Sequence, residues 1–235
     1  MSQIDPSMAL ESPAKGAPGP KPIFLDDGTS FRVGSIYCVG RNYAAHAREL
    51  GNPVQESEPI IFLKSPASVR GLEAAPVAFS EEELHYEAEL VVLIGKPVPL
   101  ASDPGLGAIA GIGLGLDLTR RALQKSLKAK GLPWTPAKSF QGSAIVTPFS
   151  PCPLAPQFDD IVFTFSLGGE MRQKGAVKDM QFSVPEILKH LSTLGELYPG
   201  DIVFTGTPEG VGPIKKGQGF SLGFQGTGIL WHGVF

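Results

Sequence analysis

Two glutamates, Glu87 and Glu89, are separated by one residue in an apolar stretch over residues 86–94. Because side chains alternate along a β-strand, both are expected on one face, with Cα atoms roughly 6.5 to 7 Å apart. Ionised carboxylates so placed beside apolar neighbours are unfavourable unless one binds a proton or a cation neutralises them. A divalent metal meets this need best, and an all-oxygen ligand set favours Mg²⁺, Mn²⁺ or Ca²⁺ over Zn²⁺.

Asp117 ends the next apolar run, residues 111–116, and is the candidate third ligand. It is expected at a junction between a strand and a helix over residues 118–130. The alternative is that Glu87 and Glu89 line the solvated face of an edge strand and bind no metal. The pair by itself does not decide between these interpretations.

His46 and Glu49 lie three residues apart in a segment expected to be helical over residues 43–50, with Asn42 as its N-cap. Side chains at this spacing are neighbours on one helix face. A carboxylate beside an imidazole orients the ring and supports its basic form, which suits removal of a proton from water. An ordinary exposed helix pair is the competing explanation.

Three further polar residues could contact a substrate. Lys138 lies in the stretch WTPAKSF, where a partly desolvated ammonium could neutralise an oxyanion. Arg121 and Gln124 share a helix face at i, i+3 and could bind a substrate carboxylate. Alternatively, Lys138 is a surface lysine, and the helix face is a solvated one that also carries Arg120, Lys125, Lys128 and Lys130.

The glycine-rich segment over residues 205–212 (TGTPEGVG) follows an apolar run. Its backbone N–H groups and the Thr207 hydroxyl could bind an anion, although a plain hairpin turn explains the composition equally well. The chain contains no Walker A, H-E-x-x-H or G-x-S-x-G motif. Their absence excludes the commonest phosphate-loop, zinc-protease and serine-hydrolase arrangements.

Composition limits the possible partners. The 235 residues are 42% hydrophobic with a net charge of −3, which suits one globular domain over residues 23–235 and gives no basic surface for nucleic acid. Residues 1–22 are rich in Pro, Gly, Ser and Ala and are expected to form a flexible arm. No apolar run spans a membrane and no signal peptide is evident, so a cytoplasmic protein acting on a small molecule is expected.

The remaining pattern predicts more strand than helix. Strands are expected over residues 35–39, 59–63, 86–94, 161–167 and 202–205 and within 220–234, and helices over 43–50, 118–130 and 184–194. This order favours an α+β, predominantly β fold over a regularly alternating Rossmann arrangement. Cys38 and Cys152 lack any paired spacing and are expected to act as small hydrophobic residues.

Six stretches, taken together and in order, resemble the fumarylacetoacetate hydrolase family: CVGRNYAAHARELGN, IFLKSPAS, HYEAELVVLIGK, GLDLTRR, GLPWTPAKSF and GDIVFTGTPEGVGP. The resemblance implies the mixed β-roll of that family's C-terminal domain, usually a homodimer. It implies Glu87, Glu89 and Asp117 as metal ligands. It also implies His46 with Glu49 as a water-activating pair on a mobile lid, and Lys138 as the oxyanion stabiliser.

Around the substrate, the resemblance implies roles for Arg121, Gln124 and Thr207, and for Arg41 and Tyr43 in the first stretch. One departure concerns Arg121, because Ala122 follows it where the family often has an aspartate. The stretch GLPWTPAKSF makes the chain most similar to the short, single-domain members that resemble acylpyruvases.

The expected activity is Mg²⁺-dependent hydrolysis of a C–C bond in an acylpyruvate-like 2,4-dioxo acid, through a metal-stabilised enolate. The same enolate serves decarboxylation of an oxaloacetate-like 2-oxo acid and isomerisation of a 2-hydroxydienedioate, so these remain alternatives. A protein that binds a metal or ligand without catalysis is a third possibility, against which His46, Glu49 and Lys138 argue.

Overall fold

The computed structural model describes residues 23–49, 51, 57–72, 83–152 and 157–235. The predicted arm over residues 1–22 and the short apolar segment 77–79 lie outside these ranges. The described chain is mostly β-strand with a few short helices, which confirms the predicted α+β, predominantly β fold. No helix in the described ranges is long and apolar enough to cross a membrane.

A mixed eight-stranded sheet forms the centre of the molecule. Its order is β4-β3-β14-β7-β8-β10-β5, and β11 also pairs with β8. Two pairings are parallel, β3 with β14 and β5 with β10. The strands are β3 (Ile36–Gly40), β4 (Ile60–Lys64), β5 (Val69–Gly71), β7 (Ala88–Ile94), β8 (Ile109–Asp117), β10 (Ala144–Val146), β11 (Ser150–Pro151) and β14 (Ile202–Phe204).

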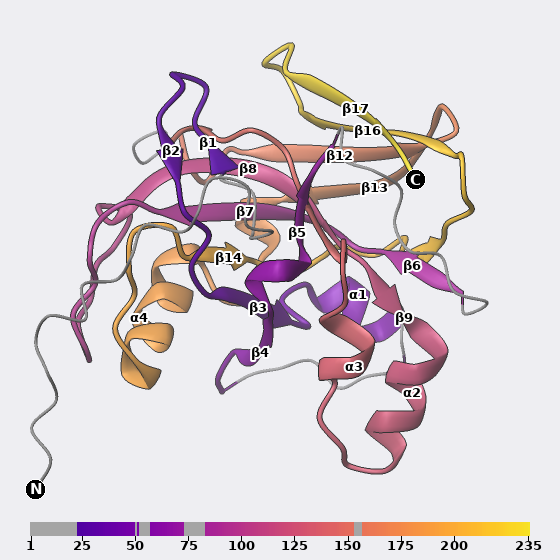
Figure 1. Ribbon diagram of the computed structural model, residues 1–235, viewed down its shortest axis with the longest axis horizontal. Helices are drawn as coiled ribbons and strands as arrows, with labels where there is room; N and C mark the ends of the chain where they lie inside the picture. The colour runs from indigo at the N-terminus through magenta and orange to yellow at the C-terminus, as the bar shows by residue number, and fades with distance from the viewer. Residues whose placement is uncertain (1–22, 50, 52–56, 73–82, 153–156) are drawn as a thin grey trace, which may run out of the picture.

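Three smaller sheets complete the β structure, and the four-stranded one lies over β7 and β8 (Figure 1). Its order is β13-β12-β16-β17, comprising β12 (Val162–Leu167), β13 (Glu170–Ala176), β16 (Gly219–Phe224) and β17 (Leu230–Val234). The others are β1-β2 and β15-β6-β9, comprising β1 (Ile23–Phe24), β2 (Ser30–Phe31), β6 (Leu84–Tyr86), β9 (Thr119–Arg120) and β15 (Gly212–Pro213). Every residue of β7 is buried because the layers enclose it from both faces.

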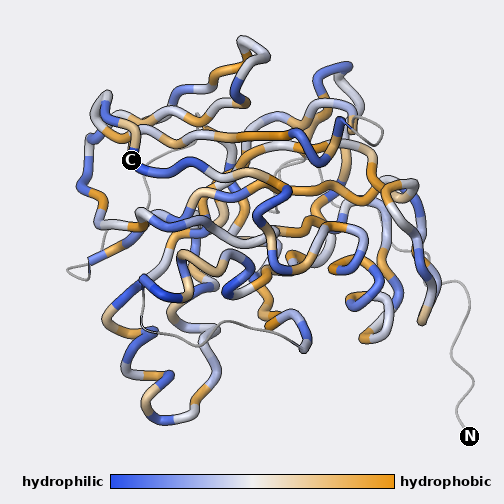
Figure 2. The backbone as a smooth tube through the Cα atoms, turned by 180° about the vertical axis from the view of Figure 1, so that it is seen from behind, coloured by the Kyte–Doolittle hydropathy of each residue, from blue (hydrophilic) through white to orange (hydrophobic). Residues whose placement is uncertain are grey.

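In the view of Figure 1 the four helices lie below the four-stranded layer. Helix α4 nevertheless packs on the same face of the central sheet as that layer, since its buried residues share one hydrophobic core with Leu90 and Val92 of β7 and with Phe163 of β12. They are α1 (Ala44–Glu49), α2 (Arg121–Ala129), α3 (Thr135–Lys138) and α4 (Val184–Leu194), and two 3₁₀ turns span Pro66–Ser68 and Val177–Asp179. Helix α4 has the predicted bounds, and Ser183 and Glu186 form a capping box at its start. Figure 2 shows hydrophobic segments concentrated in the long central strands, while α2 alternates between hydrophobic and hydrophilic residues.

Two predicted elements have other bounds than expected, because the short strands β6 and β9 pair with each other. The predicted strand over residues 86–94 is divided at Glu87 into β6 and β7. The predicted helix over 118–130 begins only at Arg121, since Thr119 and Arg120 pair with β6. Tertiary pairing therefore overrides local helix propensity at Leu118 to Arg120.

Asn42 does not cap α1 as predicted. Its side-chain amide donates to the carbonyl oxygens of Thr205 at 2.8 Å and Phe182 at 3.0 Å, and its Oδ1 accepts from the Phe182 N–H. A buried asparagine thus joins the start of α1 to the ends of two distant segments. Buried backbone groups must find hydrogen-bond partners. The Asn42 side chain therefore satisfies the backbone of Thr205 and Phe182 instead of forming one hydrogen bond at the helix start.

Candidate metal and substrate site

The three acidic residues Glu87, Glu89 and Asp117 meet where β7 and β8 pair. Glu89 lies opposite Gly115, and the Asp117 N–H donates to the Glu87 carbonyl at 2.8 Å. One carboxylate oxygen from each residue lies within 4.8 Å of the others, and all three residues are at most 5% exposed. The alternative of a solvated edge strand does not hold, since β7 lies between β14 and β8.

Three cations surround these carboxylates. The Lys138 ammonium lies 2.6 Å from both Glu87 Oε2 and Asp117 Oδ2, and Arg121 pairs with the other oxygen of Glu87. Sequence reasoning missed Lys64, whose ammonium lies 2.7 Å from Asp117 Oδ1 and is fully buried. A lysine closing the apolar strand Ile60–Lys64 was the available signal, because a buried lysine needs an anionic partner.

The surrounding charges shift the pKa values of the buried groups in different directions. Burial opposes ionisation of Glu87, but the charges of Lys138 and Arg121 hold its pKa well below the usual value. Burial, followed by the charges of Asp117 and Glu87, raises the pKa of Glu89 well above the usual value. Lys138 stays protonated, because the two carboxylates outweigh its desolvation and raise its pKa.

The residues fit a hard divalent cation. Three buried carboxylates supply only oxygen ligands, and Glu89 is the member that forms no ion pair with a described cation. Its Oε2 instead accepts a 2.6 Å hydrogen bond from the Gly206 N–H. A cation at the triad would neutralise the carboxylate that Lys138, Arg121 and Lys64 leave uncompensated.

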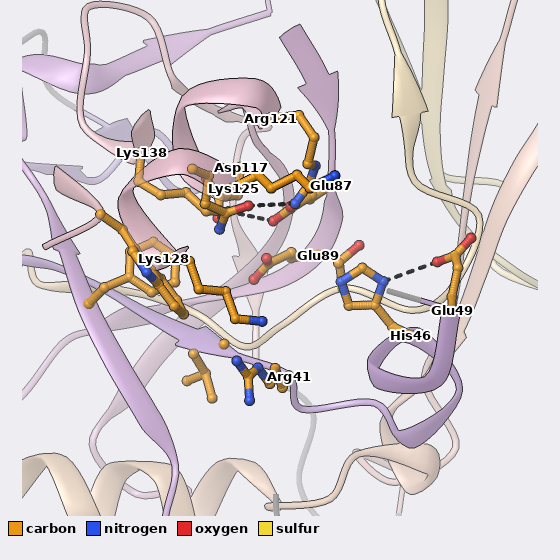
Figure 3. Close-up of a pocket in the computed structure, with 16 residues that line it drawn as sticks. Arg41, His46, Glu49, Glu87, Glu89, Asp117, Arg121, Lys125, Lys128 and Lys138 are labelled. Atoms are coloured by element: carbon orange, nitrogen blue, oxygen red, sulfur yellow. Dashed lines mark hydrogen bonds and ion pairs between the residues drawn. The ribbon is translucent and has the colours of Figure 1, made fainter. Parts of the chain in front are cut away.

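His46 and Glu49 form the predicted pair on α1, with Nδ1 of the imidazole 3.2 Å from Glu49 Oε2 (Figure 3). His46 is 5% exposed and Glu49 is partly exposed, and both line the same cavity as the carboxylates. The Gly210 N–H also donates to both Glu49 oxygens, at 3.0 and 3.2 Å. The dyad is therefore held by contacts from two segments far apart in sequence.

The glycine-rich segment 205–212 binds anions, but in this structure they are carboxylates of the chain itself. Gly206 and Gly210 donate their N–H groups to Glu89 and Glu49, as described above. Both glycines have positive φ, and a Cβ on Gly210 would lie 2.2 Å from the Arg172 carbonyl oxygen. The Thr207 hydroxyl lines the cavity but donates to the Ala88 carbonyl at 2.8 Å.

Gln173 supports this segment and was not predicted, because the polar strand EMRQKGA carries no pattern that singles it out. It is 1% exposed. Its Oε1 accepts from the Ala88 N–H at 2.9 Å, while its Nε2 donates to Thr207 Oγ1 and the Pro208 carbonyl, each at 2.8 Å. One amide thus joins β13 and the start of β7 to the glycine-rich segment.

Helix α2 directs one face at a cavity of about 500 Å³. Arg121 and Gln124 lie on it, and Arg121 Nη1 donates to Gln124 Oε1 at 2.7 Å. With Ala122 in place of an aspartate, Arg121 is oriented by Gln124 and Glu87. Lys125 and Lys128, which the sequence suggested were solvated, line the same cavity, together with the aromatic pair Phe62 and Trp134.

The two remaining predicted substrate residues have different positions. Arg41, directly after β3, lines the cavity. Tyr43 is buried, its hydroxyl donates to the Ala176 carbonyl at 3.2 Å, and it is not part of the cavity lining. The lining of this cavity therefore contains every predicted site residue except Tyr43, which packs in the core.

Comparison with known proteins identifies the family of the chain. The family model for the fumarylacetoacetate hydrolase C-terminal domain matches residues 35–234. Oxaloacetate tautomerase FAHD1 of Arabidopsis thaliana is 44% identical over 202 residues, which cover 83% of this chain and 89% of the relative.

Two solved structures have the same fold. Fumarylpyruvate hydrolase from Pseudomonas aeruginosa, solved with Mn²⁺ and pyruvate, is 35% identical with a TM-score of 0.83, covering 93% of this chain and 97% of that one. A 5-carboxymethyl-2-hydroxymuconate delta-isomerase from Mycobacterium smegmatis is 29% identical with a TM-score of 0.71, covering 87% and 79%. The chain therefore belongs to the fumarylacetoacetate hydrolase family.

Proposed function

We propose that the protein is a Mg²⁺-dependent enzyme that hydrolyses a C–C bond in an acylpyruvate-like 2,4-dioxo acid. The observation that carries the proposal is the His46–Glu49 pair, which opens onto the same cavity as the three carboxylates. A base beside a cation site is what the attack of water on a 2-oxo acid derivative requires. The oxygen-only ligands favour Mg²⁺, and Mn²⁺ or Ca²⁺ would satisfy the same donors.

Each group of side chains has a separate role in the proposed hydrolysis. Glu87, Glu89 and Asp117 would hold the cation, which supplies Lewis-acid stabilisation to the 2-oxo and carboxylate oxygens when it is bound. His46, oriented by Glu49, takes a proton from water, and the resulting hydroxide adds to the carbonyl carbon at position 4. The C3–C4 bond then breaks, its electron pair forms the enolate of pyruvate, and C3 takes up a proton.

Lys138 acts differently from the isolated oxyanion donor that the sequence suggested. Its ammonium already contacts Glu87, Asp117 and the Thr119 hydroxyl. In the proposed mechanism it fixes the orientation of two metal ligands and adds positive charge beside the developing oxyanion. Arg121 and Gln124 bind the carboxylate of the 2-oxo acid group.

A second candidate is keto–enol tautomerisation of an oxaloacetate-like 2-oxo acid. Its support is the similarity to oxaloacetate tautomerase FAHD1 across most of both chains. The His46–Glu49 pair would then move a proton between C3 and solvent, with no attack on a carbonyl. Decarboxylation of the same acid and isomerisation of a hydroxydienedioate use the same enolate and remain alternatives.

A panel assay distinguishes these reactions. Purified protein with Mg²⁺ is incubated with an acylpyruvate, with oxaloacetate and with a hydroxydienedioate, and the products are followed by NMR. Pyruvate plus a free acid indicates hydrolysis, rapid exchange at C3 indicates tautomerisation, and CO₂ release indicates decarboxylation. Absence of turnover of every compound with Mg²⁺, Mn²⁺ and Ca²⁺ contradicts the proposal and favours a protein that only binds a metal or ligand.

The proposal also includes a cytoplasmic homodimer. The support for a dimer is the family resemblance, together with exposed Leu63 on strand β4 at the sheet edge. Light scattering after size-exclusion chromatography tests the assembly, and a mass near that of one 24.8 kDa chain contradicts it.

A further inference from the structure

We propose that Lys64 is a positioning residue, which holds the candidate metal ligand Asp117 in place from outside the cavity. This role rests on the proposed function, because it takes Glu87, Glu89 and Asp117 as the ligands of a divalent cation. Lys64 itself reaches neither substrate nor metal, since its side chain is fully buried and it lies outside the lining of the substrate cavity.

The Lys64 ammonium is anchored by backbone groups of three segments. Its Nζ donates to the Leu118 carbonyl at 3.4 Å, and to the carbonyl and the hydroxyl of Ser143, each at 3.1 Å. It also donates to the carbonyl of Lys138, the last residue of α3. An ammonium has three N–H groups, so these acceptors are sufficient for all of them. The place of the charge is therefore fixed without any hydrogen bond to a carboxylate.

The contact between Lys64 and Asp117 is an ion pair without a hydrogen bond. Nζ lies 2.7 Å from Asp117 Oδ1, but this oxygen accepts no hydrogen bond from the described residues. The N–H groups point at the carbonyls instead, so the attraction is one of charge. Lys138 takes the other oxygen of Asp117, Oδ2, at 2.6 Å. A carboxylate with an anchored cation beside each oxygen has little freedom to rotate.

Lys64 also connects both members of the Lys138–Asp117 ion pair. It binds the backbone carbonyl of Lys138 and the carboxylate of Asp117. Ser143 strengthens the first contact, because its hydroxyl donates to the same Lys138 carbonyl at 2.8 Å. The end of β4 thereby sets the position of α3 relative to the end of β8, where Asp117 lies.

A contribution to stability does not by itself explain a lysine at this position. Desolvation offsets most of the attraction in a buried ion pair, and apolar residues of similar volume are often equally stable. A neutral donor could satisfy the carbonyl groups. The positive charge of Lys64 has a use where Asp117 must keep one orientation before a cation binds.

Charge and position predict opposite effects of removing Lys64 on metal affinity. By charge alone, the ammonium repels a cation bound at Asp117, so a neutral replacement should tighten metal binding. The loss of a group that orients a metal ligand instead weakens metal affinity, typically by about 10- to 100-fold. The direction of the change therefore distinguishes a positioning residue from a charge that merely lies nearby.

The test is Mn²⁺ binding to the full chain, measured from the electron paramagnetic resonance signal of the free ion. Lys64→Met should weaken binding by about tenfold or more. Lys64→Gln keeps donors for the carbonyls without the charge, so it should also weaken binding and gives the comparison if Lys64→Met does not fold. Lys130→Met is the matched control, since Lys130 is exposed and lies outside the cavity lining. Unchanged or tighter binding in either folded Lys64 variant overturns the proposal.

A double-mutant cycle tests whether Lys64 acts through Asp117. In the Asp117→Asn background, Lys64→Met should change Mn²⁺ affinity by less than about twofold, because the carboxylate that Lys64 orients is already absent. A further loss as large as the one in the wild-type background overturns the proposal, since Lys64 would then act on the site by another route.

The outcomes separate this role from the proposed function. Mn²⁺ affinity that depends on Lys64, in a protein that converts none of the 2-oxo acids, supports the positioning role while the proposed function fails. Hydrolysis of an acylpyruvate, with Mn²⁺ affinity independent of Lys64, supports the proposed function and overturns the positioning role. A wild-type protein that binds no Mn²⁺ overturns both.

Discussion

At the scale of single residues, identical carboxylates acquire different properties from their neighbours. Glu87 faces Lys138 and Arg121, which lower its pKa, whereas Glu89 is buried beside two other carboxylates, which raises its pKa. Glu49 is partly exposed and accepts hydrogen bonds from Gly210 while contacting His46. The candidate metal ligands and the proposed base are therefore distinct groups that can be tested separately.

The first residue-scale prediction concerns Glu49→Gln. Glutamine keeps an acceptor for the Gly210 N–H but removes the charge that orients His46 and supports its basic form. Hydrolysis of an acylpyruvate should fall by at least about 10²-fold in kcat, with Mg²⁺ affinity unchanged. Glu209→Gln is the control, since Glu209 is exposed and lies outside the cavity lining. Near-normal turnover in Glu49→Gln would remove the pair from the mechanism.

The second residue-scale prediction is a pH dependence of metal binding. The raised pKa of Glu89 means that the metal-free protein retains a proton at pH values above 4.5, the ordinary value for glutamate. A metal ligand must be deprotonated, so binding releases this proton, and affinity should rise with pH until the folded pKa of Glu89 is passed. Glu87 contributes no such proton, because its pKa is lowered.

Calorimetry in buffers of different ionisation enthalpy measures the proton release directly. The Glu89→Gln variant should bind Mg²⁺ weakly and release no proton. An affinity for Mg²⁺ in the wild-type protein that is constant from acidic to neutral pH would contradict the assignment of Glu89 as a ligand that titrates on binding.

At the scale of elements, the site is assembled from segment ends held by buried polar side chains. Asn42 joins the start of α1 to the end of β14, and Gln173 joins β13 to the start of β7 and the glycine-rich segment. These hydrogen bonds place Thr207 and the Gly206 and Gly210 N–H groups against the carboxylates and the dyad. The arrangement of these elements in space therefore depends on buried side-chain amides as well as on apolar packing.

The element-scale prediction concerns Gln173→Leu. The change leaves the buried Ala88 N–H without its acceptor and frees the glycine-rich segment, so the free energy of unfolding should fall by about 1 to 3 kcal/mol. Urea denaturation measures this loss. Turnover should fall as well, because the Gly210 contact to Glu49 loosens.

Lys174→Gln is the matched control, since Lys174 is exposed on the opposite face of β13. An unchanged unfolding midpoint in Gln173→Leu would show that this amide is not a structural link between β13 and β7.

At the scale of the whole molecule, the cluster of charges connects the central sheet to the helical side. Lys64 ends β4, Lys138 ends α3 and Arg121 begins α2. All three converge on Glu87, which lies between β6 and β7, or on Asp117 at the end of β8. The four-stranded sheet covers the opposite face of β7 and β8, so the charge cluster lies on the side of these strands that faces α2 and α3 (Figure 1). A cation bound there would contact groups that come together only in the folded state.

The prediction at this scale is that Mg²⁺ stabilises the entire fold. Because the three candidate ligands meet only after folding, Mg²⁺ at 100 times its Kd should add about 2.7 kcal/mol to the free energy of unfolding. Thermal denaturation with increasing Mg²⁺, and after removal of metal with EDTA, measures the shift in Tm. Glu89→Gln should abolish the shift, and an equal shift in that variant would place the bound cation elsewhere.

The sequence by itself determined the elements whose signals are local. Helix α4 has its predicted bounds because a capping box and an apolar period coincide, and β3, β4 and β14 follow their apolar runs. His46 and Glu49 are neighbours by helix geometry alone, and Glu87 and Glu89 share a face by strand geometry. Six motifs in order also predicted the family, which the comparison confirmed.

Only the tertiary structure decided which charges meet. Lys64 and Asp117 are 53 positions apart, and nothing in either local pattern encodes their 2.7 Å contact. The same holds for Gln173 and for Asn42, whose partners are 34 to 163 positions distant, and for Lys128, which local spacing described only as part of a helix face. Periodicity determines which way a side chain faces, whereas strand pairing and layer packing determine what it faces.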